Sequence, residues 1–271
     1  MTEQEPTPAV IDTSVPHPAR RYNYWLGGKD NFAADRESAD AIEQKFPGMR
    51  AGVRANRDVL GRMTRYLAAE AGIRQFLDIG TGLPTEDNTH EVAQRIAPDS
   101  RVLYVDNDPL VMAHARALLT SSGEGVTNYI EADLRDPQAI LSAPQLRNTL
   151  DLNQPVALML IAVLHFISGP GEARTIVKRL LDELPSGSYL AATHFTLDFL
   201  PEHERAAYQQ MLDAGLSDVW PRDRAEFTAL FDGLELVDPG VALVSQWRPE
   251  DASDPVDPSR ISIWAGVARK P

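Results

Sequence analysis

The sequence predicts a doubly wound, Rossmann-like α/β fold, in which helices cover both faces of a mostly parallel sheet of seven strands. The apolar segment 75–79 contains Asp78 and runs into a turn that holds Gly80 and Gly82. A second apolar segment ends in Asp106. Strand, glycine turn, helix, strand and acid follow one another in this order in a mononucleotide-binding βαβ unit. Because a Cβ would obstruct a sharp turn beside a ligand, and an acid can accept hydrogen bonds from ribose hydroxyls, we expect a nucleoside cofactor.

Hydrophobic periodicity predicts the other elements of the alternating pattern. Asn88 is expected to cap a helix, with Glu91 completing a capping box, and Pro109 is expected to open the next helix. The segment 155–167 is the most hydrophobic run, as a central strand buried on both faces requires. The expected strands are 75–79, 101–106, 126–132, 155–167 and 189–193, and the expected helices are 35–46, 52–71, 88–96, 110–119, 172–184 and a region around 200–212.

The end of the chain changes character. Segments 234–237, 243–247 and 261–268 are strand-like, with no long helix between the last two. This ending predicts an antiparallel strand at one edge of the sheet, which is typical of class I methyltransferases rather than of nicotinamide-binding domains. Pro84 also stands where the third glycine of a nicotinamide-type turn would be. The loop 249–259 is rich in Asp and Pro and is expected to be mobile.

Composition narrows the class of protein. With 271 residues and 43% hydrophobic content, the chain can bury a full core. The 26 basic and 39 acidic residues give a net charge of −13, which argues against a nucleic-acid partner. The absence of cysteine excludes disulfides, thiolate zinc sites and cysteine nucleophiles. No segment has the pattern of a membrane span or a signal peptide, so we expect a cytoplasmic protein. No cluster of His and Asp has metal-ligand spacing, so we expect no metal.

Three parts are predicted along the chain: a disordered tail at 1–16, an N-terminal helical lid segment at 17–71 and a core at 72–271. Aromatic residues of the lid segment gather around the glycine pair 27–28, and they either cap the core or cover a bound cofactor. Four arginines are interspersed along the expected helix 52–71. Most would form a solvated face, although some could meet an anionic substrate or a carboxylate. These arginines are Arg54, Arg57, Arg62 and Arg65.

Three stretches carry a resemblance to a known family. The sequences ARRYNYWLGGKDNFAADR, LDIGTGLP…NTHEVAQ and VLYVDNDPLVMAHARALL resemble a bacterial S-adenosyl methyltransferase family, within the class I superfamily that depends on S-adenosylmethionine. The resemblance covers nearly all of the chain from Ala19 onward, and its first stretch is specific because ordinary methyltransferases lack it. It implies a class I fold, S-adenosylmethionine as cofactor and methyl transfer, but it names no acceptor. We expect a small molecule.

The resemblance also implies roles for individual residues. Asp78 would lie near the cofactor's ammonium, and Asp106 would bind the ribose hydroxyls, although Asp106 could instead be an ordinary strand-end turn residue. Asp133 would meet the adenine amino group, although it could equally be a turn residue. The full set expected to bind cofactor is Tyr22, Asp78, Gly80, Thr81, Gly82, Asp106, Asn107, Asp133, Leu134 and Ala162.

Methyl transfer depends chiefly on alignment of the acceptor with the methyl carbon. A general base is needed only if the acceptor must lose a proton. His165 and His194 end neighbouring predicted strands and titrate near neutral pH, so they are the catalytic candidates, with a satisfied core histidine as the alternative. A protein that binds S-adenosylmethionine without catalysis also remains open, because no Asn/Asp-Pro-Pro-Tyr signature follows the fourth strand. An NAD-dependent oxidoreductase is less favoured.

Overall fold

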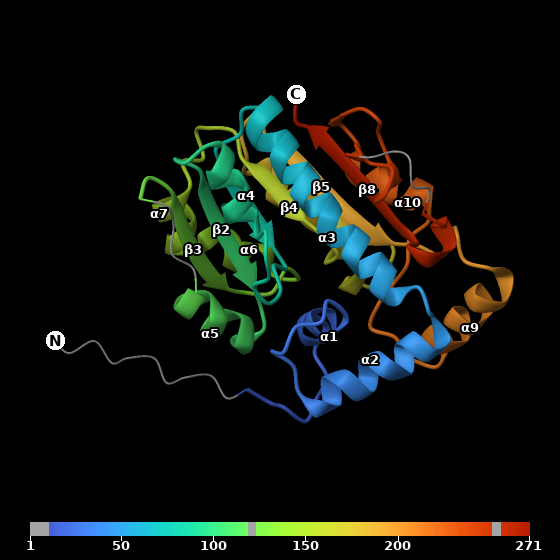
Figure 1. Cartoon of the computed structure of the whole chain (residues 1–271). Helices are drawn as coiled ribbons and strands as arrows, with labels where there is room; N and C mark the ends of the chain where they lie inside the picture. The colour runs from blue at the N-terminus through green and yellow to red at the C-terminus, as the bar shows by residue number, and fades with distance from the viewer. Residues whose placement is uncertain (1–10, 119–122, 251–255) are drawn as a thin grey trace.

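The computed structural model describes residues 11–118, 123–250 and 256–271. Its centre is one eight-stranded sheet in the order β3-β2-β1-β4-β5-β8-β6, with β7 paired to β8 beside this path (Figure 1). Strands β1 to β5 pair in parallel, and β8 runs antiparallel to β5, β6 and β7. The predicted fold class and antiparallel edge are confirmed. The count of seven becomes eight through the two-residue strand β7.

The elements have the following bounds. The strands are β1 Gln75–Ile79, β2 Arg101–Asp106, β3 Val126–Glu131, β4 Ala157–Leu160, β5 Tyr189–Phe195, β6 Glu235–Leu236, β7 Ala242–Leu243 and β8 Ile263–Arg269. The α-helices are α1 Pro18–Trp25, α2 Ala33–Lys45, α3 Met49–Arg65, α4 Thr89–Ile96, α5 Pro109–Leu118, α6 Pro137–Ser142, α7 Pro144–Thr149, α8 Glu172–Asp182, α9 Glu202–Asp213 and α10 Arg224–Thr228.

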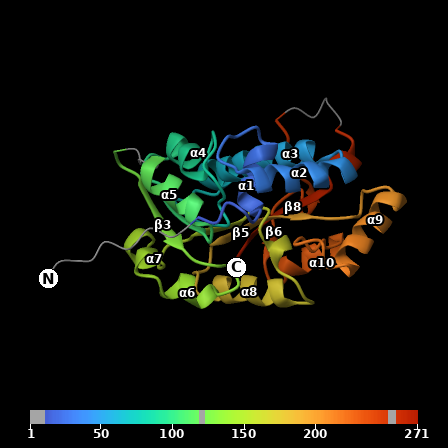
Figure 2. The same ribbon diagram turned by 90° about the horizontal axis from the view of Figure 1, so that it is seen from below.

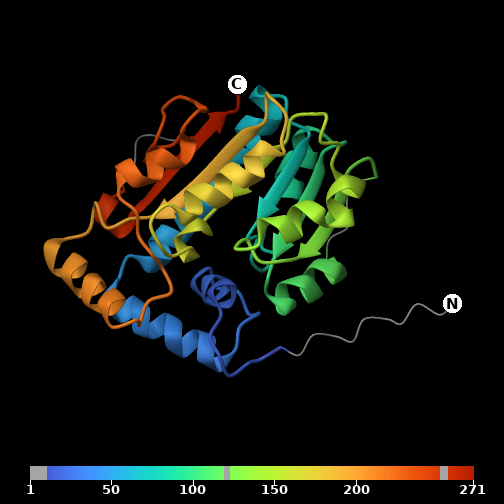
Figure 3. The same cartoon turned by 180° about the vertical axis from the view of Figure 1, so that it is seen from behind.

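The core has two layers because successive side chains of a strand point to opposite faces of the sheet. In β1, Phe76 packs with the apolar side of α3, whereas Leu77 packs with α6 and α8. Figure 2 shows α3 and α4 on one face of the sheet and α6 and α8 on the other, and Figure 3 shows α8 from behind. Full burial of each such side chain contributes about 1.5–3 kcal/mol. The central strands are therefore apolar on both faces.

Local sequence signals predict the ends of several strands and helices correctly. The strands β1 and β2 begin and end at the predicted residues. Asn88 caps α4, and its backbone N–H donates to Oε2 of Glu91 at 2.8 Å, which completes the predicted capping box. Pro109 opens α5. The last residue predicted for that helix, 119, lies outside the described residues.

Two strand predictions are wrong at their ends. The run 155–167 forms only the short strand β4, because the chain leaves the sheet at Ala162, whose φ of 54° is left-handed. The apolar residues that follow line a cavity or pack in the core, so their hydrophobicity does not reflect strand structure. In 243–247 only Leu243 is in a strand. Trp247 follows a turn closed by hydrogen bonds to the Leu243 carbonyl, and it is buried beneath α3.

The first described residues lie against the domain. Ile11 packs near Leu83 and Val111, and the carbonyl of Asp12 accepts a hydrogen bond from Arg20. Residues 1–10 of the predicted tail and residues 251–255 of the predicted mobile loop lie outside the described residues. Within the described ranges, no helix combines the length and hydrophobicity needed to cross a membrane.

The turn after β1 requires glycine for two reasons. Gly80 has a φ of +77°, and a Cβ there would lie 2.4 Å from Cγ2 of Val163. Gly72 has a similar φ of +71° with no atom within 4 Å of such a Cβ. The second glycine is therefore a matched control that isolates the steric clash from the backbone strain.

We expect Gly80→Ala to destabilise the protein by about 2–5 kcal/mol, because about 1–2 kcal/mol of left-handed strain adds to overpacking against Val163. Gly72→Ala should cost only the strain. Urea denaturation followed by tryptophan fluorescence measures both changes. Equal losses for the two variants would contradict this explanation.

Candidate active site

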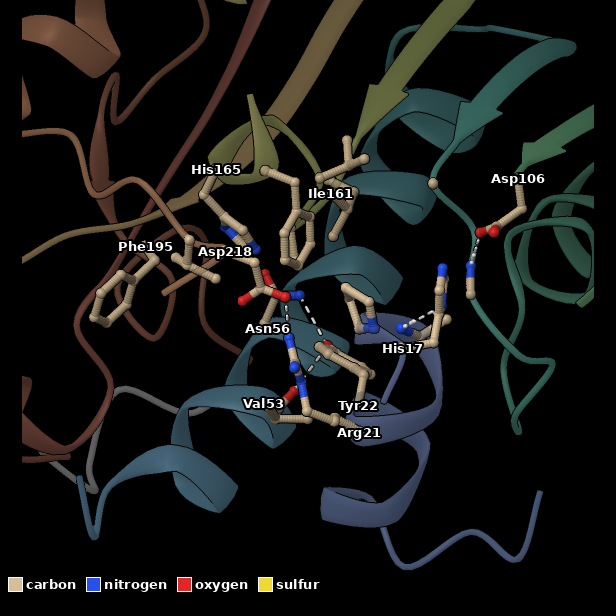
Figure 4. Close-up of a pocket in the computed structure, with 18 of the residues that line it drawn as sticks. His17, Arg21, Tyr22, Val53, Asn56, Asp106, Ile161, His165, Phe195 and Asp218 are labelled. Atoms are coloured by element: carbon tan, nitrogen blue, oxygen red, sulfur yellow. Dashed lines mark hydrogen bonds and ion pairs between the residues drawn. The ribbon is translucent and has the colours of Figure 1, made fainter. Parts of the chain in front are cut away.

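One cavity of about 1030 Å³ lies along the carboxyl ends of the parallel strands, where α1 and the start of α3 face the sheet. It extends from the loops after β2 and β3 to the loop after α9. Small-molecule sites typically measure about 300–1,000 Å³, so this cavity is large enough for two ligands side by side. Figure 4 shows side chains from both ends of it, with Asp106 at one end and Phe195 at the other.

Every residue expected to bind cofactor lines this cavity, from Tyr22 in α1 to Ala162 after β4. They come from five separate parts of the chain. The sheet topology brings these parts together because the carboxyl ends of neighbouring parallel strands meet at one edge. Their contacts with a cofactor remain a prediction.

The Asp106 carboxylate is held in place at the end of β2. The backbone N–H of Gly82 donates to Oδ2 at 2.8 Å, and that of Asp108 donates to Oδ1 at 2.9 Å. Burial raises the pKa of Asp106, and these two N–H groups oppose that rise. Each carboxylate oxygen keeps a free lone pair. The carboxylate is therefore a fixed acceptor that can take two further hydrogen bonds.

Asp133 and Asn107 meet at the mouth of the same half. Nδ2 of Asn107 donates to Oδ2 of Asp133 at 3.1 Å, and Arg135 donates to both carboxylate oxygens of Asp133. Although burial raises the pKa of Asp133, the hydrogen bonds from Arg135 and Asn107 lower it overall. This cluster joins the loops after β2 and β3.

Asp78 and Arg57 both line this half of the cavity, and Asp78 is buried. Burial raises the pKa of Asp78 to about 6, against the lowering effects of a 2.6 Å hydrogen bond from the Thr89 hydroxyl and of the charge on Arg57. Arg57 Nη2 donates to the Glu86 carbonyl at 2.8 Å, whereas its Nε is buried without a partner. The hydroxyl of Tyr129, also in the cavity wall, is buried and unpartnered too. Buried donors without partners are rare in proteins.

The sequence did not single out Arg57 from the other arginines. Its position could have done so, because Val53, Arg57 and Leu60 follow the i, i+4, i+7 spacing of the buried face. Arg54, in contrast, is exposed, as predicted for most of the set. Arg62 instead donates to two backbone carbonyls of the loop after β7.

The helix α1 is fastened to the loop after β2 by a buried ion pair. Nε and Nη2 of Arg20 donate to the two carboxylate oxygens of Asp108 at 2.9 and 2.8 Å, and both side chains are buried. Nδ1 of His17 lies 3.2 Å from the same carboxylate. This docking places Tyr22 and Trp25 in the cavity wall. Both residues line the cavity, and Trp25 also packs in a small core cluster with Ala39 and Val53.

A chain of hydrogen bonds connects α1 to the ends of β4 and β5. The Tyr22 hydroxyl donates to the Val53 carbonyl at 3.1 Å and accepts from Nδ2 of Asn56 at 2.9 Å. Oδ1 of Asn56 accepts from the Thr193 hydroxyl at 2.6 Å, which accepts from the Ala162 N–H at 2.9 Å. Figure 4 shows Tyr22 and Asn56 facing each other. The network fixes the position of Ala162 relative to α1.

The two candidate histidines differ. His165 lines the cavity, and burial lowers its pKa to about 4, with Asp218 opposing the shift and Arg222 adding to it. Its Nδ1 is buried without a partner. His194 does not line the cavity, and its ring nitrogens lie 2.8 Å from the Phe195 carbonyl and 2.6 Å from Nη1 of Arg222. His194 is a satisfied core histidine, so we withdraw its catalytic role.

No group of three or more metal-binding side chains gathers anywhere in residues 11–118, 123–250 and 256–271. Charged side chains do line the cavity, and two ion pairs lie among them, Arg21 with Asp218 and Arg135 with Asp133.

The parallel sheet with an antiparallel β8, the glycine turn after β1 and the acid ending β2 define a class I methyltransferase fold. The chain matches the model of the S-adenosyl methyltransferase family over residues 4–271, and it belongs to this family. Its cofactor is therefore S-adenosylmethionine. Among curated proteins, none matches the sequence significantly.

Two solved structures are similar over nearly the whole chain. A DUF574 family protein from Streptomyces avermitilis MA-4680 is 48% identical, covers 97% of this chain and 100% of its own, and has a TM-score of 0.91. A protein from Thermobifida fusca YX is 42% identical, covers 96% of each chain and has a TM-score of 0.87. The plantazolicin methyltransferase BamL shares the fold alone, at 11% identity over 93% of this chain and 95% of its own, with a TM-score of 0.51.

We expect Asp108→Ala to cost about 3–5 kcal/mol at pH 7, because it leaves the charge of Arg20 buried without its partner. Although burial raises the pKa of Asp108, the hydrogen bond from Arg20 lowers it overall. The pair's stabilisation should therefore be present above the unfolded-state pKa of about 3.9 and be lost as pH falls through the folded-state value. Chemical denaturation of Asp108→Ala, Arg20→Met and the double variant gives the coupling energy. A coupling near zero would refute this account.

Proposed function

We propose that this chain transfers a methyl group from S-adenosylmethionine to a small-molecule acceptor held in the same cavity. The observation that carries the proposal is the continuity of the cavity, which joins the Asp106 carboxylate to an apolar half beside His165. A purely cofactor-binding protein needs no second compartment. The acceptor half therefore favours an enzyme over a sensor.

In the proposed arrangement, the cofactor lies along the ends of β1, β2 and β3. Asp106 binds the ribose hydroxyls, and the loop residues Asn107, Asp133 and Leu134 enclose the adenine. Gly80, Thr81 and Gly82 follow the methionine part, whose ammonium meets Asp78 and whose carboxylate meets Arg57. Arg57 supports this placement because it lines the cavity close enough to Asp78 to lower that group's pKa, and a guanidinium can hold a carboxylate with two hydrogen bonds.

When bound, the cofactor supplies a methyl group on a positively charged sulfur, which is a good leaving group. The protein's part is to align the acceptor and exclude water. Ala162 forms the floor of the cavity, and His165 stands beside it. Since Nδ1 of His165 is buried, we assign proton acceptance to Nε2, with Asp218 favouring the resulting charge.

Three further expectations remain proposals. The lack of cysteine supports a cytoplasmic protein, and the net charge of −13 supports the absence of a nucleic-acid partner. We also retain the division into tail, lid segment and core. The apolar side of α3 packs in the core, so α1 and α2 are the covering part of segment 17–71.

We expect His165→Ala to lower turnover by about 10²- to 10⁴-fold, because a positioned base is removed. Its affinity for S-adenosylhomocysteine should stay near the wild-type value. Formation of S-adenosylhomocysteine with an acceptor measures turnover, and calorimetry measures affinity. His203→Ala, an exposed histidine on α9, is the matched control. Unchanged turnover in His165→Ala would show that His165 is not the base.

We expect affinity for S-adenosylhomocysteine to fall about tenfold per pH unit below about pH 6. Asp78 becomes protonated there and loses its attraction for the ligand's ammonium. The Asp78→Asn variant should bind S-adenosylhomocysteine more weakly at pH 7.5 and lose this pH dependence.

The Arg57→Met substitution should weaken binding of S-adenosylhomocysteine but not of adenosine, which lacks the methionine part. Equal weakening of both ligands would contradict the assignment of Arg57.

A further inference from the structure

Aromatic rings wall the half of the cavity that lies away from Asp106. The ring centroids of Phe46 and Phe195 lie 5.4 and 5.3 Å from that of Tyr208, so the three form a continuous surface. The Tyr208 hydroxyl donates to the Val219 carbonyl at 2.8 Å and lies 2.9 Å from the Ser217 hydroxyl. Tyr208 therefore presents its ring, rather than its hydroxyl, to a ligand. Such a wall favours a flat, ring-containing molecule.

The loop after α9 gives this half an apolar entrance. Leu216 is 71% exposed and Trp220 is 40% exposed, and both also line the cavity. The other large exposed apolar side chains of the described residues, such as Leu236, do not line it. Single exposed apolar residues are ordinary. Two of them at the opening of an aromatic cavity indicate the route of an apolar ligand.

The charges of this half leave no carboxylate free for a cation. Asp218 is its only acid among the described lining residues, and it forms an ion pair with Arg21. Arg21 also lies 3.4 Å from the Ser38 hydroxyl, and Lys45 stands exposed beside the cavity. A protonated amine would lose its hydration without gaining a free counter-charge, which is unfavourable. This half therefore disfavours a cationic acceptor.

His165 supplies the polar contact that remains. Figure 4 places its ring between Phe195 and Ile161, next to the Asp218 carboxylate. Because its pKa is lowered to about 4, the imidazole is neutral at physiological pH. A neutral imidazole can accept a hydrogen bond from a hydroxyl. An acceptor that carries a hydroxyl on a ring would meet both the aromatic wall and this nitrogen.

We propose that the methyl acceptor is an uncharged aromatic molecule whose phenolic hydroxyl binds His165 while its ring packs against Phe46, Phe195 and Tyr208. The proposal rests on the methyl-transfer function above. In the reaction, the bond between the methyl carbon and sulfur breaks, and its electron pair stays on sulfur to give S-adenosylhomocysteine. A bond forms between that carbon and the phenolic oxygen. The phenolic proton passes to Nε2 of His165 and then to water.

The test is a binding experiment on the full chain saturated with S-adenosylhomocysteine. The probes are 1-naphthol, naphthalene, 1-naphthylmethylamine and 1-naphthoate. Calorimetry and the quenching of tryptophan fluorescence measure the binding of each probe. We expect 1-naphthol to bind at least tenfold more tightly than the ammonium and carboxylate probes. Tighter binding of the amine or the carboxylate would overturn the proposal.

Two substitutions separate the hydroxyl contact from the apolar one. His165→Ala should weaken 1-naphthol about fivefold, the effect of one hydrogen bond, and leave naphthalene unchanged. Leu216→Ser should weaken both probes about threefold, whereas Leu236→Ser, a change at an exposed leucine that does not line the cavity, should weaken neither. An identical response of 1-naphthol and naphthalene to His165→Ala would contradict the hydroxyl contact.

Titration with S-adenosylhomocysteine separates a failure of the proposed function from a failure of the proposed acceptor class. If S-adenosylhomocysteine fails to bind, the proposed function fails and the acceptor class fails with it. If S-adenosylhomocysteine binds but 1-naphthol does not, only the acceptor class is overturned. Binding of both, with 1-naphthol favoured, supports the two together.

Discussion

The buried ion pair between Arg20 and Asp108 is the interaction on which the site depends. It joins α1, which precedes the sheet in sequence, to the loop after β2, two residues beyond Asp106. This pair adds a buried charged attachment to the hydrogen bonds that Tyr22 of α1 forms with Val53 and Asn56 of α3. Both charges are removed from water, so neither is stable without the other. The N-terminal segment is thereby part of the site.

The one cavity has two ends of different character. Tyr22 and Asn56 lie between Asp106 at one end and Phe195 at the other (Figure 4). Their hydrogen bonds join both side chains to the network that ends at Ala162, which holds them in place. Among the described residues that line the cavity, Trp25, Arg57, Tyr129 and His165 each have a buried polar atom without a partner. Carboxylates at one end and aromatic rings at the other match a reaction between a charged donor and an apolar acceptor.

The sequence predicted the fold, several boundaries and a set of residues that the structure gathers along one cavity, because these depend on local signals. The glycines of the turn after β1, the capping pair of Asn88 and Glu91, and the acids at strand ends each determine the structure of a segment only a few residues long. It could not show that Trp247 packs beneath α3, or that Nη1 of Arg222 lies at hydrogen-bond distance from Nε2 of His194, since these contacts join distant segments. It could not separate Arg57 from its neighbouring arginines for the same reason. The aromatic wall combines Phe46, which follows α2, with Phe195 of β5 and Tyr208 of α9, and only the tertiary structure brings these together.

The most direct test of this account is a crystal structure of the protein with S-adenosylhomocysteine. It should show the ribose hydroxyls on the Asp106 carboxylate, the amino-acid end between Asp78 and Arg57, and the sulfur facing Ala162, with the aromatic half left free. A ligand whose sulfur faces away from the aromatic half, or whose amino-acid end avoids Asp78 and Arg57, would contradict it.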